Sequence, residues 1–320
     1  MKTSNHLLRR LTAALLAAVL ALSIALPVFA SDDGDTIYIN SVSDLLSLAG
    51  SCAYDQWSVG KTVILQKDLS LEGMLWEPIP SFSGQFKGNG HTISDLTITG
   101  QYSPAGLFGI VEEQGSIESL SVRGIVSVSD SADTTTGGIA GINHGTLISC
   151  QFTGVVTGDS EVGGIVGRNE SEGTIDHSTA RAIVTGKSST GGIAGYNLGA
   201  ITGCTNVGSI NTEYQEASLD TDGFTAKMVD YINNKMAAAD DDATNSVTNV
   251  ATDTGGIAGR SSGMILTSVN TGTVGYEHIG YNVGGIVGRT DGLVSGCVNQ
   301  GHILGRKDVG GIAGQAEPYR

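Results

Sequence analysis

The sequence predicts an all-β protein, a right-handed parallel β-helix (β-solenoid) with an N-terminal cap and one helical insertion. A pentapeptide, Gly-Gly-Ile-(Ala or Val)-Gly, recurs every 26 to 29 residues apart from one longer step. Between the copies, β-branched residues alternate with polar ones. A fixed repeat period in this range is typical of solenoids, and alternation with a period of two is typical of strands. The copies start at Gly137, Gly163, Gly191, Gly255, Gly284 and Gly310.

Composition agrees with a turn-rich coil. The chain of 320 residues contains 47 glycines but only five prolines, and it has no Gly-X-Y period, which excludes collagen. Aromatic residues make up 5% of the chain, which argues against a conventional core of Phe and Trp. We therefore expect aliphatic side chains to fill the interior of the coil.

The first element is a signal peptide over residues 1–30. Lys2, Arg9 and Arg10 precede an apolar run over residues 11–26, and Ala30 ends a small-x-small cleavage site. The alternative is a membrane anchor, but the run is shorter than the ~20 residues that a spanning helix needs. We expect a secreted or cell-surface protein with no stable membrane span after cleavage.

The charge limits the class of partner. Without residues 1–30, 14 basic residues remain against 32 acidic ones, a net charge of −18. Such a chain repels nucleic acid and anionic membranes. No nucleic-acid partner is therefore expected.

Residues 31–104 are expected to form the N-terminal cap and the first rungs, a rung being one turn of the coil. A strand is predicted over 36–39, a helix over 44–49 with Ser43 as N-cap, and a second strand over 60–66. A solenoid must cover its terminal rung, and we assign that role to residues 36–75.

Residues 105–320 form the regular repeats, opening with a looser copy of the pentapeptide at Ala105. Three aliphatic columns recur in phase, so we expect three strands per rung and an interior of stacked aliphatic side chains. The first column is Ile139, Ile165, Ile193, Ile257, Ile286 and Ile312; the second is Leu147, Ile175, Ile201, Ile265 and Val294; the third is Val156, Val184, Ile210, Val274 and Ile303.

Two further columns contain polar residues. Cys150, Cys204 and Cys297 share one position at intervals of two rungs, roughly 9.6 Å at ~4.8 Å per rung, beyond the ~7 Å limit of a disulfide. We expect these cysteines to be unpaired, buried thiols; Cys52 lies apart from the column. Two residues further on, Asn206, Asn270 and Asn299 are expected to form a side-chain amide ladder rather than a ligand site.

The longer step between repeats marks an insertion over residues 212–253. Phe224, Met228, Ile232 and Met236 are spaced as one face of a helix. This helix could pack across the rungs, which we favour, or it could dock a partner. The chain stops six residues after its last pentapeptide, so we expect either a fragment of a longer protein or an end covered by a partner.

No catalytic, cofactor-binding or metal-binding residue is predicted. Ser261 lies in a Gly-x-Ser-x-Gly pattern, but in the other repeats the same position holds Asn or Thr in a turn. The histidines show no ligand spacing, and the pentapeptide lacks the Lys-Ser/Thr of a phosphate-binding loop. The sequence therefore predicts a protein that is not an enzyme.

A carbohydrate-active β-helix, either a polysaccharide lyase or hydrolase or a carbohydrate-binding module, is the alternative. Such an enzyme needs carboxylates that converge on an outer groove. Asp159, Glu161, Asp176 and Glu277 are scattered along the sequence. A cluster of acidic and aromatic side chains on one outer face would favour this alternative.

The pentapeptides from Gly137 to Gly314, with Ala105–Gly109 as a looser match, resemble the GLUG-motif repeats of bacterial secreted and surface proteins. The resemblance covers about residues 105–320 and implies an adhesin-like or other surface role. It identifies no catalytic residue. The expected function is thus a non-catalytic structural or adhesive module of a larger bacterial surface protein, whose partner is an unknown protein or glycan on a host or on the cell envelope.

Overall fold

The computed structural model describes residues 35–54, 56–128, 134–212 and 251–318. Contacts divide the chain into Met1–Thr36 and Ile37–Arg320, and the fold below is that of the second unit. The signal peptide predicted over 1–30 and nearly all of the insertion predicted over 212–253, including its helical stripe, lie outside the described residues. In the part of the chain that is described, no helix is long and apolar enough to cross a membrane.

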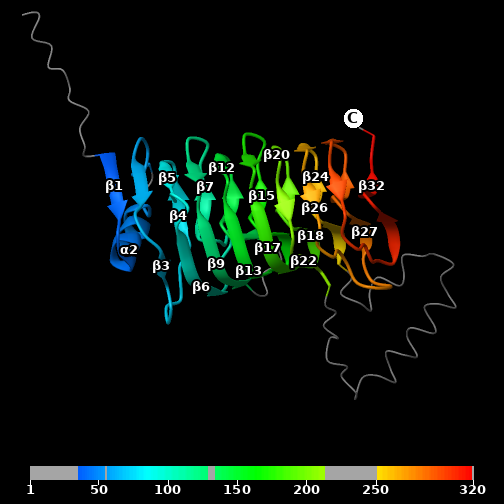
Figure 1. The fold of residues 1–320 in the computed structure, drawn as a ribbon, viewed down its shortest axis with the longest axis horizontal. Coiled ribbons are helices and arrows are strands. Elements are labelled where there is room, and N and C mark those ends of the chain that lie inside the picture. The colour runs from blue at the N-terminus through cyan, green and yellow to red at the C-terminus, as the bar shows by residue number, and fades with distance from the viewer. Residues whose placement is uncertain (1–34, 55, 129–133, 213–250, 319–320) are drawn as a thin grey trace, which may run out of the picture. The chain divides into compact units, whose positions relative to one another are not determined.

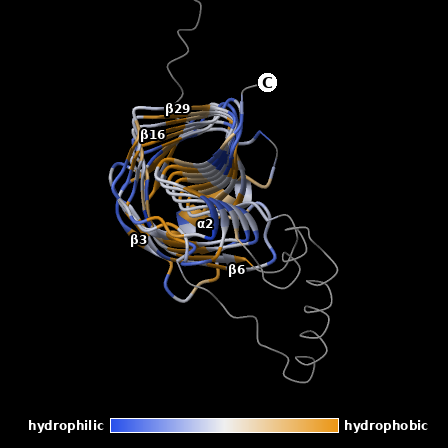
Figure 2. Ribbon diagram, turned by 90° about the vertical axis from the view of Figure 1, so that its right-hand side faces the viewer, coloured by the Kyte–Doolittle hydropathy of each residue, from blue (hydrophilic) through white to orange (hydrophobic). Residues whose placement is uncertain are grey.

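The second unit is a parallel β-solenoid, as predicted, whose rungs follow one another along its long axis (Figure 1). Four parallel sheets run along the coil, and end-on their strands superpose (Figure 2). Sheet A contains β1 (Thr36–Ile39), β2 (Thr62–Leu65), β5 (Gln85–Lys87), β8 (Ser116–Glu118), β12 (Thr146–Ile148), β16 (Thr174–Asp176), β20 (Ala200–Thr202), β25 (Met264–Leu266) and β29 (Leu293–Ser295). Sheet B contains β3 (Leu69–Ser70), β6 (Thr92–Gly100), β9 (Ser121–Val128), β13 (Gln151–Thr157), β17 (Thr179–Thr185), β21 (Thr205–Asn206), β26 (Val269–Asn270) and β30 (Val298–Asn299), with β22 (Ser209–Ile210) also paired to β17.

The remaining two sheets flank the pentapeptide. Sheet C contains β4 (Ile79–Phe82), β7 (Phe108–Val111), β11 (Ala140–Asn143), β15 (Val166–Asn169), β19 (Ala194–Asn197), β24 (Ala258–Ser261), β28 (Val287–Thr290) and β32 (Ala313–Ala316). Sheet D contains β10 (Thr136–Gly137), β14 (Ser160–Gly163), β18 (Ser188–Gly191), β23 (Thr252–Gly255), β27 (Tyr281–Gly284) and β31 (Lys307–Gly310).

A regular rung therefore has four strands, and the prediction of three was wrong. The pentapeptide is the reason. Its first glycine ends a strand of sheet D, and its fourth residue begins a strand of sheet C, as Gly163 and Val166 do. Glycine is a poor strand signal by propensity, so the sequence alone suggested a turn where two strands meet at a corner.

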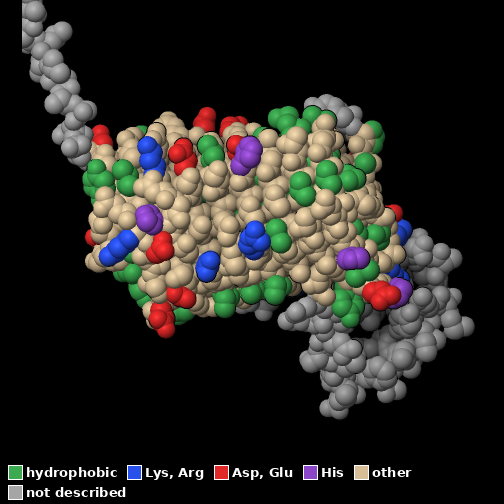
Figure 3. Space-filling view, viewed as in Figure 1, with side chains coloured by type: hydrophobic (Ala, Val, Ile, Leu, Met, Phe, Trp, Pro, Cys, Tyr) green, Lys and Arg blue, Asp and Glu red, His purple; other side chains and the backbone are tan. Residues whose placement is uncertain are grey.

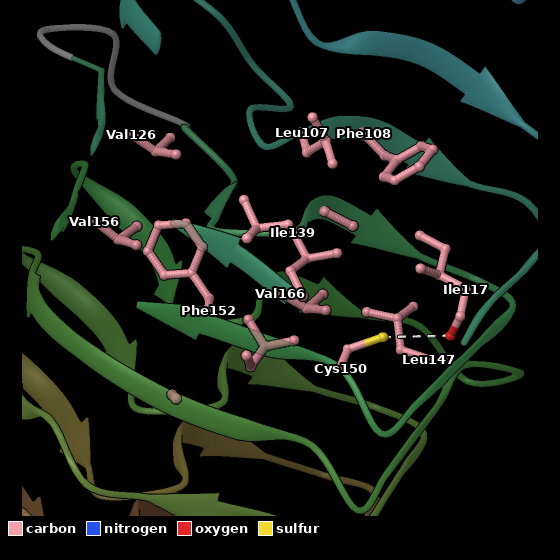
Figure 4. Close-up of a cluster of buried hydrophobic side chains, with 14 of the residues drawn as sticks. Leu107, Phe108, Ile117, Val126, Ile139, Leu147, Cys150, Phe152, Val156 and Val166 are labelled. Atoms are coloured by element: carbon pink, nitrogen blue, oxygen red, sulfur yellow. Dashed lines mark hydrogen bonds between the residues drawn. The ribbon is translucent and has the colours of Figure 1, made fainter. Parts of the chain in front are cut away.

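The predicted columns form the interior. Ile139, Leu147 and Val156 are each 0% exposed, and they point into one buried cluster with Phe152 and Cys150 (Figure 4). The same columns stay buried from rung to rung until the last rungs, where Ile312 is 43% exposed. Burial of like residues on like gives a continuous, mostly aliphatic core. It also contains aromatic residues that the composition did not lead us to expect: Trp76, Phe82, Phe86, Phe108 and Phe152 are buried.

The N-terminal region differs from prediction in detail. Helix α2 spans Val42–Ser51, and its N-cap is Ser41, whose hydroxyl accepts a hydrogen bond from the Asp44 backbone N–H at 3.2 Å. Ser43 was therefore the wrong cap, and the helix begins two residues before the predicted start. The parallel ladders also extend into the predicted cap, since β2 pairs with β5 and β3 pairs with β6.

Candidate functional site

Cys150 and Cys204 of the cysteine column are buried and unpaired, as predicted, whereas Cys297, also unpaired, is only partly buried. Cys150 and Cys204 are at most 1% exposed, and each thiol donates to a backbone carbonyl, that of Ile117 or Ile175, at 3.4 Å (Figure 4 shows the first). Burial raises the pKa of each of these two thiols to about 12. These sulfur atoms fill the core, and the raised pKa leaves them unreactive as nucleophiles.

The predicted asparagine ladder is also present. The Asn206 amide donates to Asn270 Oδ1 at 2.8 Å, and Asn270 donates to Asn299 Oδ1 at the same distance. Asn206 and Asn270 are fully buried. Their amides are consumed by pairing along the axis and are not free for a ligand.

A second ladder was not predicted. At the last residue of successive sheet C strands, Asn143 donates to Asn169 and Asn169 to Asn197, both at 2.8 Å, and Asn197 donates to Ser261 Oγ at 3.0 Å. Ser261 is 0% exposed. The Gly-x-Ser-x-Gly pattern thus places this serine as the next member of a structural ladder. The signal in the sequence is the asparagine that recurs at one repeat position, where the pattern suggested a turn and the structure has the end of a strand.

Of the acidic residues singled out in the sequence, Asp159 and Glu161 lie two residues apart around the start of β14, while Asp176 and Glu277 lie elsewhere on the coil. Asp159 pairs with Lys187 at 2.7 Å, and Glu161 pairs with Arg168. Asp176 and Glu277 each lie beside the histidine that follows them in sequence. Across the described ranges, no group of three or more His, Cys, Asp or Glu side chains could hold a metal ion.

An outer row on sheet C gathers charged and aromatic side chains. We call it the arginine–tyrosine row. It consists of Arg168, Tyr196, Arg260 and Arg289, which occupy one register position in four successive rungs. The Arg168 and Arg260 guanidinium groups lie 5.5 and 5.2 Å from the centre of the Tyr196 ring. This row is not apparent from the sequence, because tyrosine interrupts the arginines and only the register places them in line.

Carboxylates flank the arginine–tyrosine row and pair with it. Arg168 contacts Glu161 and, at 3.7 Å, Glu170, while Arg289 pairs with Glu317 of the next rung. The hydrogen bond with Glu161 raises the pKa of Arg168. Because these charges neutralise one another, the row stabilises neighbouring rungs more than it attracts a charged ligand.

A groove of about 420 Å³ lies beside Arg289, with acidic, hydroxyl and apolar groups in its wall. It is lined by Ser262, Gly263, Met264, Asp291, Gly292, Leu293 and Glu317. Glu317 is already paired with Arg289. Two acidic side chains line this groove but no aromatic residue does, so it meets only part of what a carbohydrate-active β-helix requires.

The outer face of sheet B is different in character. We call the outward side chains of β9, β13 and β17 the sheet B face. They are Ser121, Arg123, Ile125, Ser127, Gln151, Thr153, Val155, Thr157, Thr179, Arg181, Ile183 and Thr185. None of them is acidic, and in the region drawn in Figure 3 the surface over these strands is mostly uncharged polar side chains and backbone.

Comparison with known proteins gives partial similarities. No family model matches the chain. Halomucin of Haloquadratum walsbyi is 32% identical over 155 residues, covering 44% of this chain and 2% of halomucin. A protein of Evansella cellulosilytica named "Putative Gly-rich membrane protein" is 29% identical over 137 residues, covering 31% of this chain and 16% of that protein. The chain thus spans a small part of the curated relatives that it matches.

One solved structure has a related fold. It comes from Bacteroides ovatus and is described as a "putative immunoglobulin A1 protease"; it aligns with a TM-score of 0.53 over 88% of this chain and 84% of its own, at 17% identity. At this identity the likeness concerns the fold alone, and the solenoid described above agrees with it.

Proposed function

We propose that the chain is a non-catalytic β-solenoid module of an exported or cell-surface bacterial protein, and that it binds a ligand on its outer faces. The resemblance to GLUG-motif repeats and the signal-peptide pattern support an extracellular, adhesive role. The similarity to a protein named as a Gly-rich membrane protein supports the same location.

The observation on which this proposal rests is the pairing of the conspicuous polar residues from rung to rung. Ser261 and the asparagines are consumed by buried ladders, and Glu161 is neutralised by Arg168. General acid–base chemistry needs carboxylates placed together with suitably perturbed pKa values. In the described residues these groups hold the stack together instead.

A carbohydrate-active enzyme remains the second candidate, because of the groove beside Arg289. Asp291 and Glu317 both line it, and acidic side chains on an outer groove are what glycoside cleavage requires. The Glu317 carboxylate is already paired with Arg289, so one of the two carboxylates in the groove is engaged within the solenoid.

One experiment separates the two candidates. The full chain is incubated with a panel of polysaccharides and with cell-envelope material, and both retention and newly released reducing or unsaturated ends are measured. We expect retention without release. Release that is abolished in Asp291→Asn or Glu317→Gln, but not in Asp159→Asn on a distant turn, would establish the enzyme instead.

A further inference from the structure

The sheet B face stands out by its charge. The chain has 32 acidic and 17 basic residues, yet β9, β13 and β17 contain two arginines and no acidic residue. On the C-terminal side, β21, β22, β26 and β30 of the same sheet also lack Asp and Glu, while on the N-terminal side β6 contains one acidic residue, Asp95, which accepts hydrogen bonds from Ser70 and Ser94. This part of an acidic protein is therefore locally basic.

Its two arginines are aligned and exposed. Parallel pairing places Arg123, Thr153 and Arg181 in one column along the axis, so the two arginines are two rungs apart, roughly 9.6 Å. No described carboxylate lies within ion-pair distance of either guanidinium, whereas Arg168 and Arg289 on sheet C are both paired. The sheet B arginines are thus available to an anionic partner.

Arg123 interacts electrostatically with one carboxylate that lies beyond ion-pair distance. The pKa of Asp68 is lowered, first by a hydrogen bond from the Thr92 backbone N–H, then by His91, with a smaller electrostatic contribution from Arg123. Among the described groups whose pKa is shifted, none owes its shift to Arg181, so Arg181 is the stronger candidate for ligand contact.

An apolar column runs beside the arginines. Ile125, Val155 and Ile183 are register partners, and the two isoleucines are 47% and 43% exposed. Serine, threonine and glutamine side chains border both columns: Ser121, Gln151 and Thr179 on one side, and Ser127, Thr157 and Thr185 on the other. Cationic, apolar and hydroxyl groups therefore run in parallel lines along one sheet.

We propose that the sheet B face binds an acidic polysaccharide, one with carboxylates on its sugar rings, lying along the solenoid axis. Carboxylates pair with Arg181 and Arg123, the C–H faces of the sugars lie on the isoleucine–valine column, and sugar hydroxyls bond to the bordering Ser, Thr and Gln side chains. This proposal deepens the proposed function and rests on it, since it names the ligand class of the binding module.

The net charge of the whole chain opposes such a partner only weakly. At physiological ionic strength the Debye length is ~8 Å, so acidic groups on other faces of the solenoid are largely screened. The nearby arginine column then makes the electrostatic interaction with an anionic polymer attractive. Binding should weaken as salt increases.

The test is isothermal titration of the full chain with polygalacturonate, with uncharged dextran and polyglutamate as the comparison polymers. We expect Arg181→Gln to weaken polygalacturonate binding about tenfold, and Arg123→Gln/Arg181→Gln to weaken it further. Arg260→Gln removes the same charge from sheet C and should change the affinity less than twofold. Ile183→Thr, which keeps a β-branched residue in the strand, should weaken binding through the apolar column.

The outcomes are distinct. Absence of polygalacturonate binding, an equal loss in Arg260→Gln, or equal affinity for polyglutamate would overturn the proposal. If the inference fails in one of these ways but every variant still binds dextran or cell-envelope material, the module binds its ligand on another surface. The proposed function then stands without this inference. Release of new polymer ends would overturn the proposed function itself. The thermal unfolding midpoint of each variant is measured as a control. An unchanged midpoint shows that weaker binding is not caused by loss of the fold.

Discussion

Asn270 shows how a buried amide becomes compatible with a solenoid interior. It accepts from Asn206, donates to Asn299 and to the Gly272 carbonyl at 3.0 Å, and accepts from the Gly272 N–H at 3.1 Å. A buried polar group left without a partner costs about 1–3 kcal/mol. The repeat avoids that cost because each asparagine supplies the partner of the next.

The buried thiols make a prediction about pH. The pKa of Cys150 and Cys204 rises from the usual 9.0 to about 12 on folding, because burial disfavours the thiolate. The native state therefore keeps protons that the unfolded chain loses. This contribution to stability is fully present below about pH 9 and is lost as the pH rises from about 9 to about 12.

The measurement is denaturant unfolding over that pH range, compared with Cys150→Ser/Cys204→Ser. Serine already occupies the same column at Ser178 and Ser268, both fully buried. The wild type should lose stability relative to the variant as the pH rises. A constant difference between the two proteins, or native-state alkylation of Cys150 at pH 8, would contradict the burial of these thiols.

At the scale of the element, the pentapeptide and the asparagine ladder explain each other. A Cβ atom added to Gly256 would lie 2.2 Å from the Gly285 carbonyl oxygen and 2.4 Å from Asn270 Cγ. The ladder amide occupies the space that a side chain would need. Gly311 has the same place in the last copy of the motif, and nothing lies within 4 Å of a Cβ added there.

We therefore expect Gly256→Ala to destabilise the fold by more than 2 kcal/mol, since the clashing atoms include backbone that cannot move freely. Gly311→Ala should cost well under 1 kcal/mol. Chemical denaturation of both variants, with the free energy of unfolding as the readout, is the test. Equal losses in the two variants would mean that the glycines serve backbone conformation alone and not the packing of the next rung.

The sequence predicted those features in which like residues recur at one position. The aliphatic columns and the Asn206 ladder were correct because each stacks on its own kind, and burial of Cys150 and Cys204 was correct because small Ser and Cys side chains alternate in their column. The fourth strand was missed because it ends in the first glycine of the pentapeptide, and glycine has a low strand propensity. The arginine–tyrosine row and the sheet B face were missed because Arg123, Thr153 and Arg181 differ in type, and only the register places them in line.

At the scale of the whole molecule, each ladder, row and face depends on one register. The strands of successive rungs pair in parallel and, apart from a bulge where β6 pairs with β9, in phase, as in Thr157 opposite Thr185 and Ser127 opposite Thr157. A slip of one residue would turn the buried columns outward. It would also separate the arginines of the sheet B face from their apolar neighbours.

The register can be measured directly by disulfide trapping in a Cys297→Ser background, which removes the half-exposed native thiol. Cysteines placed at Thr157 and Thr185, one rung apart at ~4.8 Å, should form a disulfide on mild oxidation, within the usual Cα separation. Cysteines at Ser127 and Thr185, two rungs apart, should not. Mass spectrometry of the non-reduced protein that finds the second link and not the first would contradict the in-phase solenoid.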